Sequence, residues 1–278
     1  MIHIFCDSTG AVPAEMLEKH ANLHVIPLHI EGPEGKYISE EKTSIQWVID
    51  TSEKEKRSIP TSQPSTGDFL AAFDTVPAGD AILVITVTSG VSGTYNGAVL
   101  AARQSGRKQI AVVNSRTTAI GIVQLAEDAL EWIEEGVEFE EIVKRMNAAA
   151  LRMYTTFTVD TLDYLRRGGR IGKAAGLIGS ILKIKPVIFL NEKNEVDVLD
   201  KVRTSKKAAA CMLKFVADHS PCRRIGIVHI ENPEGAEDLR ARVQAAHPDV
   251  PVTVSTGTPV LAAYLGPGLT GIIFESAE

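Results

Sequence analysis

Cysteine is scarce in this chain, with Cys6, Cys211 and Cys222 the three examples among 278 residues. Their number is odd and no two of them have CxxC spacing, so the sequence lacks the pattern of a disulfide framework or a zinc cluster. Histidines and carboxylates do not gather at the spacing of metal ligands either. We therefore expect three core or incidental thiols, no bound metal and no cofactor.

Long apolar runs are also missing. The longest, such as residues 81–85, fall far short of the roughly 20 residues that cross a bilayer as a helix. The opening MIHIFCDSTG has neither the basic segment nor the sustained apolar segment of a signal peptide. These two absences predict a cytoplasmic protein without a transmembrane segment.

The chain has no surplus of positive charge, since its net charge is −6. Phosphate backbones are bound through an excess of Lys and Arg, so a general nucleic-acid partner is disfavoured. The composition of 44% hydrophobic and 23% charged residues is that of an ordinary globular protein. At this length the chain can build two modest hydrophobic cores, which predicts two domains.

The first half alternates short β-rich apolar runs with helical patterns. Residues 2–6, 25–30, 81–87 and 110–113 are predicted strands, and apolar residues recur at helical spacing through 122–133 and 139–146. This alternation is typical of a parallel sheet covered by helices. We predict an N-terminal α/β domain with a mainly parallel sheet over residues 1–150.

The pattern changes after residue 150. Residues 154–159, 225–230 and 271–274 are predicted strands, and an apolar stripe through 208–216 predicts a helix. We predict a second α/β domain with a mixed sheet over residues 151–278.

Three predicted strands of the first half are followed by loops rich in hydroxyl side chains, at residues 7–10, 88–94 and 114–118. Ligands of open α/β sheets collect at the carboxyl ends of strands. The loops therefore predict a polar rim that hydrogen-bonds an anion or a polar head group.

Ser92 lies between a predicted strand and a helix, where unpaired helix amides favour an anion. Capping of its own helix explains the same serine equally well. The sequence Gly90-Val91-Ser92 also begins like the nucleophile elbow of a hydrolase, but Thr94 stands where that motif requires glycine. His229 is the one histidine at a strand end that can be considered as a base, so a serine hydrolase is disfavoured.

Two other segments have both a functional and an ordinary explanation. Thr66 is expected to cap a helix, which leaves Thr61 as a turn residue by local reasoning. The glycine-rich loop that contains Arg170 is either a phosphate-binding or partner-binding loop or a solvated basic loop. It lacks the lysine-hydroxyl ending of a P-loop.

Taken together, these segments resemble the DegV family of bacterial fatty-acid-binding proteins over essentially the whole chain. The matching motifs, in order, are DST at 7–9, TSQPS at 61–65, SGVSGTY at 89–95, LRRGGRIG at 165–172, IKP at 184–186, KVR at 201–203 and GPG at 266–268. Each motif is weak alone, whereas their common order is specific.

The resemblance implies two α/β domains with the acyl chain of a long-chain fatty acid buried between them. It implies a carboxylate held by Thr61, Ser92, Gly93 and Tyr264, and contacts to phosphate or to a partner from Arg170 and Arg203. The implied partner is the ATP-binding subunit of a fatty acid kinase, which phosphorylates the bound acid to an acyl phosphate for phospholipid synthesis. This chain would then be a non-catalytic lipid-binding subunit.

One position departs from the resemblance, because family members often carry histidine where this chain has Tyr264. A phenol can donate a hydrogen bond to a carboxylate but does not become a cation near neutral pH. Two alternatives stay open: an enzyme that acts on a phosphorylated or acyl metabolite, and a regulatory protein that senses lipid without a kinase partner.

Overall fold

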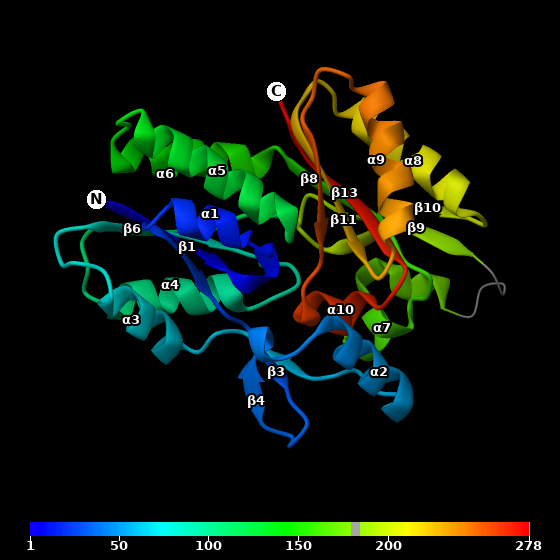
Figure 1. Ribbon diagram of the computed structural model, residues 1–278, viewed down its shortest axis with the longest axis horizontal. Coiled ribbons are helices and arrows are strands. Elements are labelled where there is room, and N and C mark those ends of the chain that lie inside the picture. The colour runs from blue at the N-terminus through cyan, green and yellow to red at the C-terminus, as the bar shows by residue number, and fades with distance from the viewer. Residues whose placement is uncertain (179–183, 278) are drawn as a thin grey trace.

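The computed structural model describes residues 1–178 and 184–277. It contains two α/β halves that lie side by side, each built on its own sheet (Figure 1). The predicted fold class is therefore confirmed, while the exact boundary at residue 150 stays a prediction.

The N-terminal half is built on a parallel four-stranded sheet in the order β2-β1-β6-β7. The strands are β1 (Ile2–Asp7), β2 (Leu23–Ile26), β6 (Ala81–Thr86) and β7 (Ile110–Asn114). Helices α1 (Ala14–Lys19), α5 (Ile120–Glu134) and α6 (Phe139–Leu151) cover one face of this sheet, and α3 (Thr66–Asp74) and α4 (Thr94–Gln104) cover the other (Figure 1). Every residue of β6 is buried, as expected for an apolar strand between two helical layers.

The single strand predicted over 25–30 is wrong, because the chain changes sheets within it. Pro27 has no backbone N–H and interrupts the ladder between β2 and β3 (His29–Glu31). Strand β3 then pairs antiparallel with β4 (Tyr37–Ser39) and β5 (Thr61–Ser62) in a small third sheet. Helix α2 (Ile45–Glu55) lies between β4 and β5 in the chain and packs against α10 (Pro259–Leu265) of the C-terminal half.

The predicted cap of α3 is also corrected. Its N-cap is Ser65 rather than Thr66, because Ser65 and Asp68 form a reciprocal capping box.

The C-terminal half has a mixed six-stranded sheet, as predicted, in the order β10-β9-β8-β13-β11-β12. Its strands are β8 (Met153–Thr158), β9 (Lys185–Leu190), β10 (Val196–Val202), β11 (Cys222–Ile230), β12 (Val252–Thr256) and β13 (Leu269–Ser276). The pair β11 and β12 is parallel and the other pairs are antiparallel. Helices α8 (Ser205–Asp218) and α9 (Pro233–Ala246) pack on the outer face through one apolar cluster.

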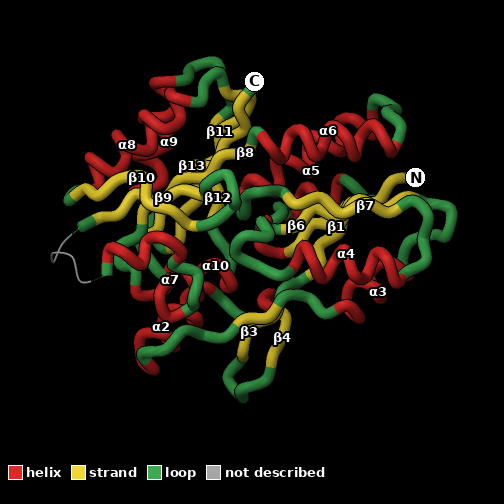
Figure 2. Tube along the Cα trace, turned by 180° about the vertical axis from the view of Figure 1, so that it is seen from behind, coloured by secondary structure: helices red, strands yellow, loops and turns green. Residues whose placement is uncertain are grey.

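The inner face of this sheet is turned toward the N-terminal half, as the view from behind also shows (Figure 2). One buried apolar cluster contains Ile85 and Ile122 of the first half together with Ile273 of the second. Asp128 on α5, which is fully buried, forms ion pairs with Arg223 and Arg224 on β11. The two halves thus share a core and a buried charge network.

Several short helical elements also lie near the contact between the two halves. These are η1 (Ser8–Gly10), η2 (Glu40–Lys42), α7 (Asp163–Arg167), η3 (Gly172–Leu177) and α10 (Pro259–Leu265). The Tyr164 hydroxyl on α7 donates to Glu53 on α2 over 2.7 Å. This hydrogen bond connects the segment that contains α2 to the C-terminal half.

The three cysteines are free, with Cys6 and Cys222 buried. Across residues 1–178 and 184–277, no helix has the length and apolar character needed to cross a membrane. The same residues contain no group of three His, Cys, Asp or Glu side chains placed to hold a metal ion.

Candidate functional site

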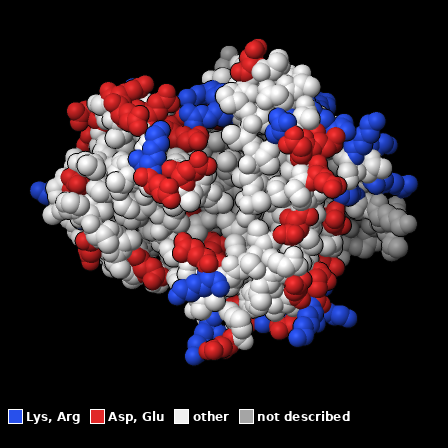
Figure 3. Space-filling view, viewed as in Figure 1, with Lys and Arg blue, Asp and Glu red and all other residues white. Residues whose placement is uncertain are grey.

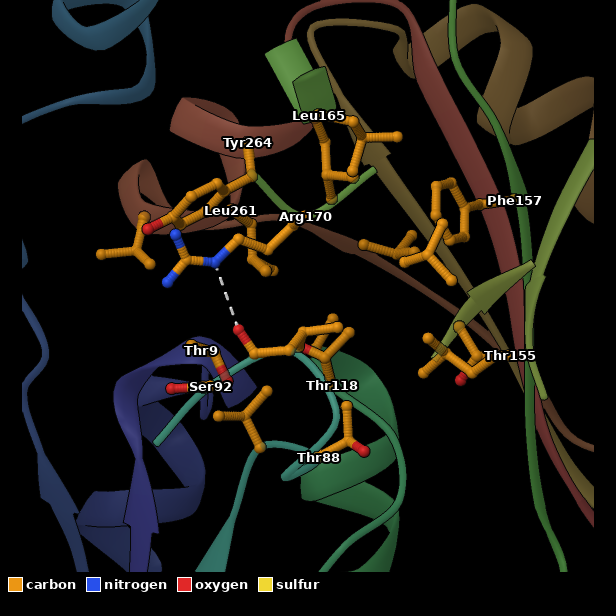
Figure 4. Close-up of a pocket in the computed structure, with 18 of the residues that line it drawn as sticks. Thr9, Thr88, Ser92, Thr118, Thr155, Phe157, Leu165, Arg170, Leu261 and Tyr264 are labelled. Atoms are coloured by element: carbon orange, nitrogen blue, oxygen red, sulfur yellow. Dashed lines mark hydrogen bonds between the residues drawn. The ribbon is translucent and has the colours of Figure 1, made fainter. Parts of the chain in front are cut away.

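A cavity of about 320 Å³ lies between the two halves (Figure 4). Its volume falls within the range of about 300–1,000 Å³ that is usual for small-molecule pockets. The N-terminal half contributes the loops after its strands, and the C-terminal half contributes the inner face of its sheet and helices α7 and α10. The site is therefore formed by residues of both halves.

The three hydroxyl-rich loops meet at this cavity, as the sequence predicted. Strands β1, β6 and β7 are parallel neighbours, so their carboxyl ends share one edge of the sheet. The loop after β1 contributes Thr9, the loop after β6 contributes Thr88 and Ser92, and the loop after β7 contributes Thr118.

Asp7 holds two of these loops together. Its buried carboxylate accepts hydrogen bonds from the Thr9 backbone N–H over 3.0 Å, from the Thr9 hydroxyl over 2.6 Å and from the Val87 backbone N–H. Burial raises the pKa of Asp7 to about 6, although these donors oppose the shift. Asp7 thus shapes the cavity wall without lining it.

The interior of the cavity is more apolar than its threonines suggest. The Thr155 hydroxyl is 2.9 Å from the Thr117 hydroxyl, and the Thr156 hydroxyl donates to the Ile188 carbonyl over 2.9 Å. Hydroxyls that are bonded within the protein leave their methyl groups for a ligand. The hydroxyls of Thr88 and Thr118 differ, because they are buried without a hydrogen-bond partner among the described residues. Most of the other lining side chains are apolar: Leu28, Val87, Phe157, Leu165, Leu190, Val196, Val228, Ile230, Val260, Leu261, Leu265, Leu269 and Ile273.

One end of the cavity is polar, and Thr61 and Tyr264 meet there. Their hydroxyls are hydrogen-bonded to each other, so one of the two protons stays available for a ligand. The Arg170 guanidinium lies 4.6 Å from the centre of the Tyr264 ring, a cation–π contact. Arg170 Nε donates to the Val91 carbonyl over 3.3 Å. Figure 4 shows Arg170 beside Tyr264 at this end, with the hydrogen bond drawn as a dashed line.

Close packing at Gly168 sets the position of the Tyr264 ring. A Cβ atom on Gly168 would lie 2.4 Å from Cδ1 of that ring. Glycine at this position of the basic loop is therefore a steric requirement of the site, in addition to any flexibility that it provides.

Ser92 lies beside the first turn of α4, whose N-cap is Gly93. The Ser92 Oγ is 2.8 Å from the Thr94 Oγ1 and accepts from the Thr94 backbone N–H over 3.3 Å. When the Thr94 hydroxyl donates to Ser92, the Ser92 proton is free to donate to a ligand. The N-terminal amides of α4 add a partial positive charge at the same end.

Arg170 has the only charged side chain among the lining residues that the structure describes. It is also exposed, which places the polar end of the cavity next to solvent. A single cation, hydroxyl donors and a helix N-terminus suit an anionic head group, and the apolar interior suits a hydrocarbon tail.

His229 does not support a hydrolase. Its Nδ1 accepts from the Asn232 backbone N–H over 3.4 Å, and burial lowers its pKa. Neither His229 nor another histidine lines the described part of the cavity. Ser92 therefore has no imidazole base there.

Five of the six predicted site residues line this cavity: Thr61, Ser92, Gly93, Arg170 and Tyr264. Arg203 does not, because it is exposed between β10 and the N-cap of α8. The sequence reasoning missed the apolar lining, including Leu261 and Leu265 on α10. The one local signal for these two was their helical spacing around Tyr264.

Known proteins resemble this chain over nearly all of its length. A family model described as "Uncharacterised protein, DegV family" matches residues 1–277. A DegV domain-containing protein of Staphylococcus aureus (strain COL) is 30% identical over 275 residues, which cover 97% of this chain and 97% of that protein.

Solved structures share the fold. A DegV family protein from Thermus thermophilus, described as fatty acid binding, has a TM-score of 0.90 at 27% identity and covers 99% of both chains. The Fatty Acid Kinase (Fak) B3 protein of Streptococcus pneumoniae, solved with linoleic acid, has a TM-score of 0.87 at 22% identity, again over 99% of both chains. At that lower identity the likeness shows the fold alone.

Proposed function

Because the chain belongs to the DegV family, we propose that it binds a long-chain fatty acid in the cavity between its two halves. The acyl chain lies along the apolar interior and the carboxylate lies at the polar end. The observation that carries this proposal is the division of one cavity into an apolar interior and an end with a single cation and several hydroxyls. The fatty-acid-binding relative from Thermus thermophilus supports it.

The hydrocarbon tail supplies most of the affinity. Burying the roughly fourteen methylenes of a sixteen-carbon acid at about 0.8 kcal/mol each gives on the order of 11 kcal/mol before the costs of association. The head group therefore has to orient the acid more than it has to hold it.

We assign the carboxylate to Thr61, Ser92, Gly93 and Tyr264. The hydroxyls donate to its oxygens, and Gly93 brings the first turn of α4 close to it. Arg170, stacked on Tyr264, supplies the positive charge that the phenol cannot.

We further propose that the chain does not itself catalyse a reaction and presents the acid to an ATP-binding kinase subunit in the cytoplasm. A carboxylate oxygen would attack the γ-phosphorus of ATP held by that subunit. The bond from this phosphorus to the β-phosphate oxygen would break, which gives acyl phosphate and ADP. The exposure of Arg170 supports access from outside, and the resemblance in sequence motifs supports the kinase partner.

Arg203 is proposed as a contact for that partner rather than for the bound acid. It lies with Lys206 and Lys207 on an exposed segment at the start of α8. The end of the molecule that carries α8 shows many Lys and Arg side chains, whereas Asp and Glu gather over α5 and α6 (Figure 3).

A chain-length series tests the proposal. Dissociation constants of saturated acids from ten to eighteen carbons should fall about fourfold for each added methylene, until the cavity is full. Acyl phosphate should form when the chain, the acid, ATP and the kinase subunit are all present.

Affinity that does not depend on chain length would contradict fatty acid binding. Turnover of a phosphorylated or acyl metabolite by the chain alone would favour an enzyme. Tight acid binding without acyl phosphate formation would favour a lipid-sensing regulator.

A further inference from the structure

Glu40 is a buried carboxylate that joins the N-terminal half to helix α10. Its side chain is 2% exposed. One carboxylate oxygen accepts from the Val260 backbone N–H over 2.9 Å, and the other accepts from the Ser8 hydroxyl. The Ser8 oxygen accepts in turn from the Leu28 backbone N–H over 2.8 Å. A single side chain thus connects the end of β1 to the first turn of α10.

No cation neutralises this carboxylate within residues 1–178 and 184–277. Burial raises the pKa of Glu40, and the hydrogen bonds from Ser8, Val260 and the Thr258 side chain oppose that shift. An acid that is buried at this cost and bonded to a helix amide is expected to have a specific structural task.

The helix that Glu40 contacts forms one wall of the cavity. Leu261, Tyr264 and Leu265 on α10 all line it, and they follow Val260 within five residues. Because α10 has only seven residues, a displacement of its first turn carries all three side chains with it.

The other end of α10 is fixed by packing. Gly266 ends the helix with a φ of 69°, and a Cβ atom there would lie 2.5 Å from the Tyr164 ring. The helix is therefore held at its end by a steric contact. Its start is held by the Glu40 hydrogen bond together with the N-cap Thr258, whose hydroxyl accepts from the Leu261 backbone N–H over 3.4 Å.

We propose that Glu40 is a positioning residue of the cavity, which acts through α10 to hold Tyr264 against Thr61 and the two leucines against the ligand. The part of this inference that concerns the ligand rests on the proposed binding of a fatty acid. The part that concerns the position of Tyr264 does not.

The test compares three variants with the wild-type chain. Glu40→Ala leaves the Val260 N–H without its acceptor, whereas Glu40→Gln keeps an acceptor oxygen of similar reach. Glu41→Ala is the matched control, since Glu41 is the exposed neighbour on the same short helix. Thermal unfolding of each variant shows whether it is folded.

Two readouts are measured on each. The first is the dissociation constant for hexadecanoic acid. The second is the ¹⁹F NMR spectrum of the protein labelled with 3-fluorotyrosine, in which the Tyr264 resonance is assigned by its loss in Tyr264→Phe.

We expect Glu40→Ala to weaken hexadecanoate binding about tenfold and to shift the Tyr264 resonance. Glu40→Gln should restore both towards wild type, and Glu41→Ala should change neither. A folded Glu40→Ala variant with wild-type affinity and an unmoved resonance would overturn the inference, as would equal losses in Glu40→Ala and Glu40→Gln without a shift at Tyr264.

Failure of the wild-type chain to bind hexadecanoate would instead reject the proposed function. The Tyr264 resonance would then still decide whether Glu40 positions α10.

Discussion

Replacing Ser92 with alanine removes one hydroxyl from the polar end of the cavity and leaves the apolar interior unchanged. A hydrogen bond to a charged acceptor contributes about 1.5–3 kcal/mol. Ser92 is only partly buried, which favours the low end of that range. Since about 1.4 kcal/mol corresponds to a factor of ten, the dissociation constant for hexadecanoic acid should rise about tenfold.

The same substitution should affect a neutral ligand less. Hydrogen bonds between neutral groups contribute about 0.5–1.5 kcal/mol, and the low end again applies to the partly buried Ser92, so the dissociation constant for hexadecanol should rise by only about twofold. The tail, at roughly 11 kcal/mol before costs, is the same in both ligands. Binding therefore survives in the variant, and the difference between acid and alcohol isolates the contribution of the carboxylate.

Competition against a fluorescent acid at pH 7.5 measures both ligands in one format. Ser89→Ala is a suitable control, because the Ser89 oxygen accepts from the Asn114 amide over 2.8 Å in the same loop without lining the cavity. Equal losses for acid and alcohol in Ser92→Ala, or no loss for either, would refute the placement of the carboxylate at Ser92.

Three further substitutions address other parts of the site. Arg170→Gln should weaken acid binding by only about two- to fivefold, because the Arg170 side chain is exposed to solvent. This loss of affinity should become smaller as salt is added, and a loss that does not depend on salt would contradict an electrostatic role. Gly168→Ala should displace the Tyr264 ring and weaken binding, whereas Gly176→Ala, with nothing within 4 Å, should leave the dissociation constant unchanged. Burial raises the pKa of Asp7 to about 6, so the folded protein binds a proton at Asp7 more tightly than the unfolded chain does. Protonation of Asp7 therefore stabilises the fold at low pH, and this stabilisation is lost as pH rises through 6. Between pH 7 and pH 5 the unfolding free energy of the wild type should therefore rise about 1 kcal/mol more than that of Asp7→Asn, as measured by urea unfolding; equal slopes would refute it.

Much of the fold could be predicted because its signals are local. The apolar runs that form β1, β6, β7 and β8 are strands within one residue of the predicted bounds. Strands β11 and β13 also lie where they were predicted but extend further, to 9 and 8 residues. The run at 25–30 is continuous in apolar content, and its single proline is the one local sign that two strands share it. Strands such as β12, with several exposed residues, have no comparable apolar run and were not predicted.

The polar loops could be placed together because parallel strands bring their carboxyl ends to one edge. The pairing of Thr61 with Tyr264 had no such local signal, since 203 residues separate them in the chain. It was reached through the resemblance to a family. The contact between Glu40 and Val260 joins residues 220 apart, and no motif marked it.

The most direct test of the account is denaturing mass spectrometry of an organic extract from the purified protein. A buried acyl chain dissociates slowly enough to survive purification when it is held by many apolar contacts. The account predicts a long-chain fatty acid in near-stoichiometric amount, which Ser92→Ala should retain less well. An extract without fatty acid, followed by no thermal stabilisation on adding saturated or unsaturated acids, would contradict the central claim.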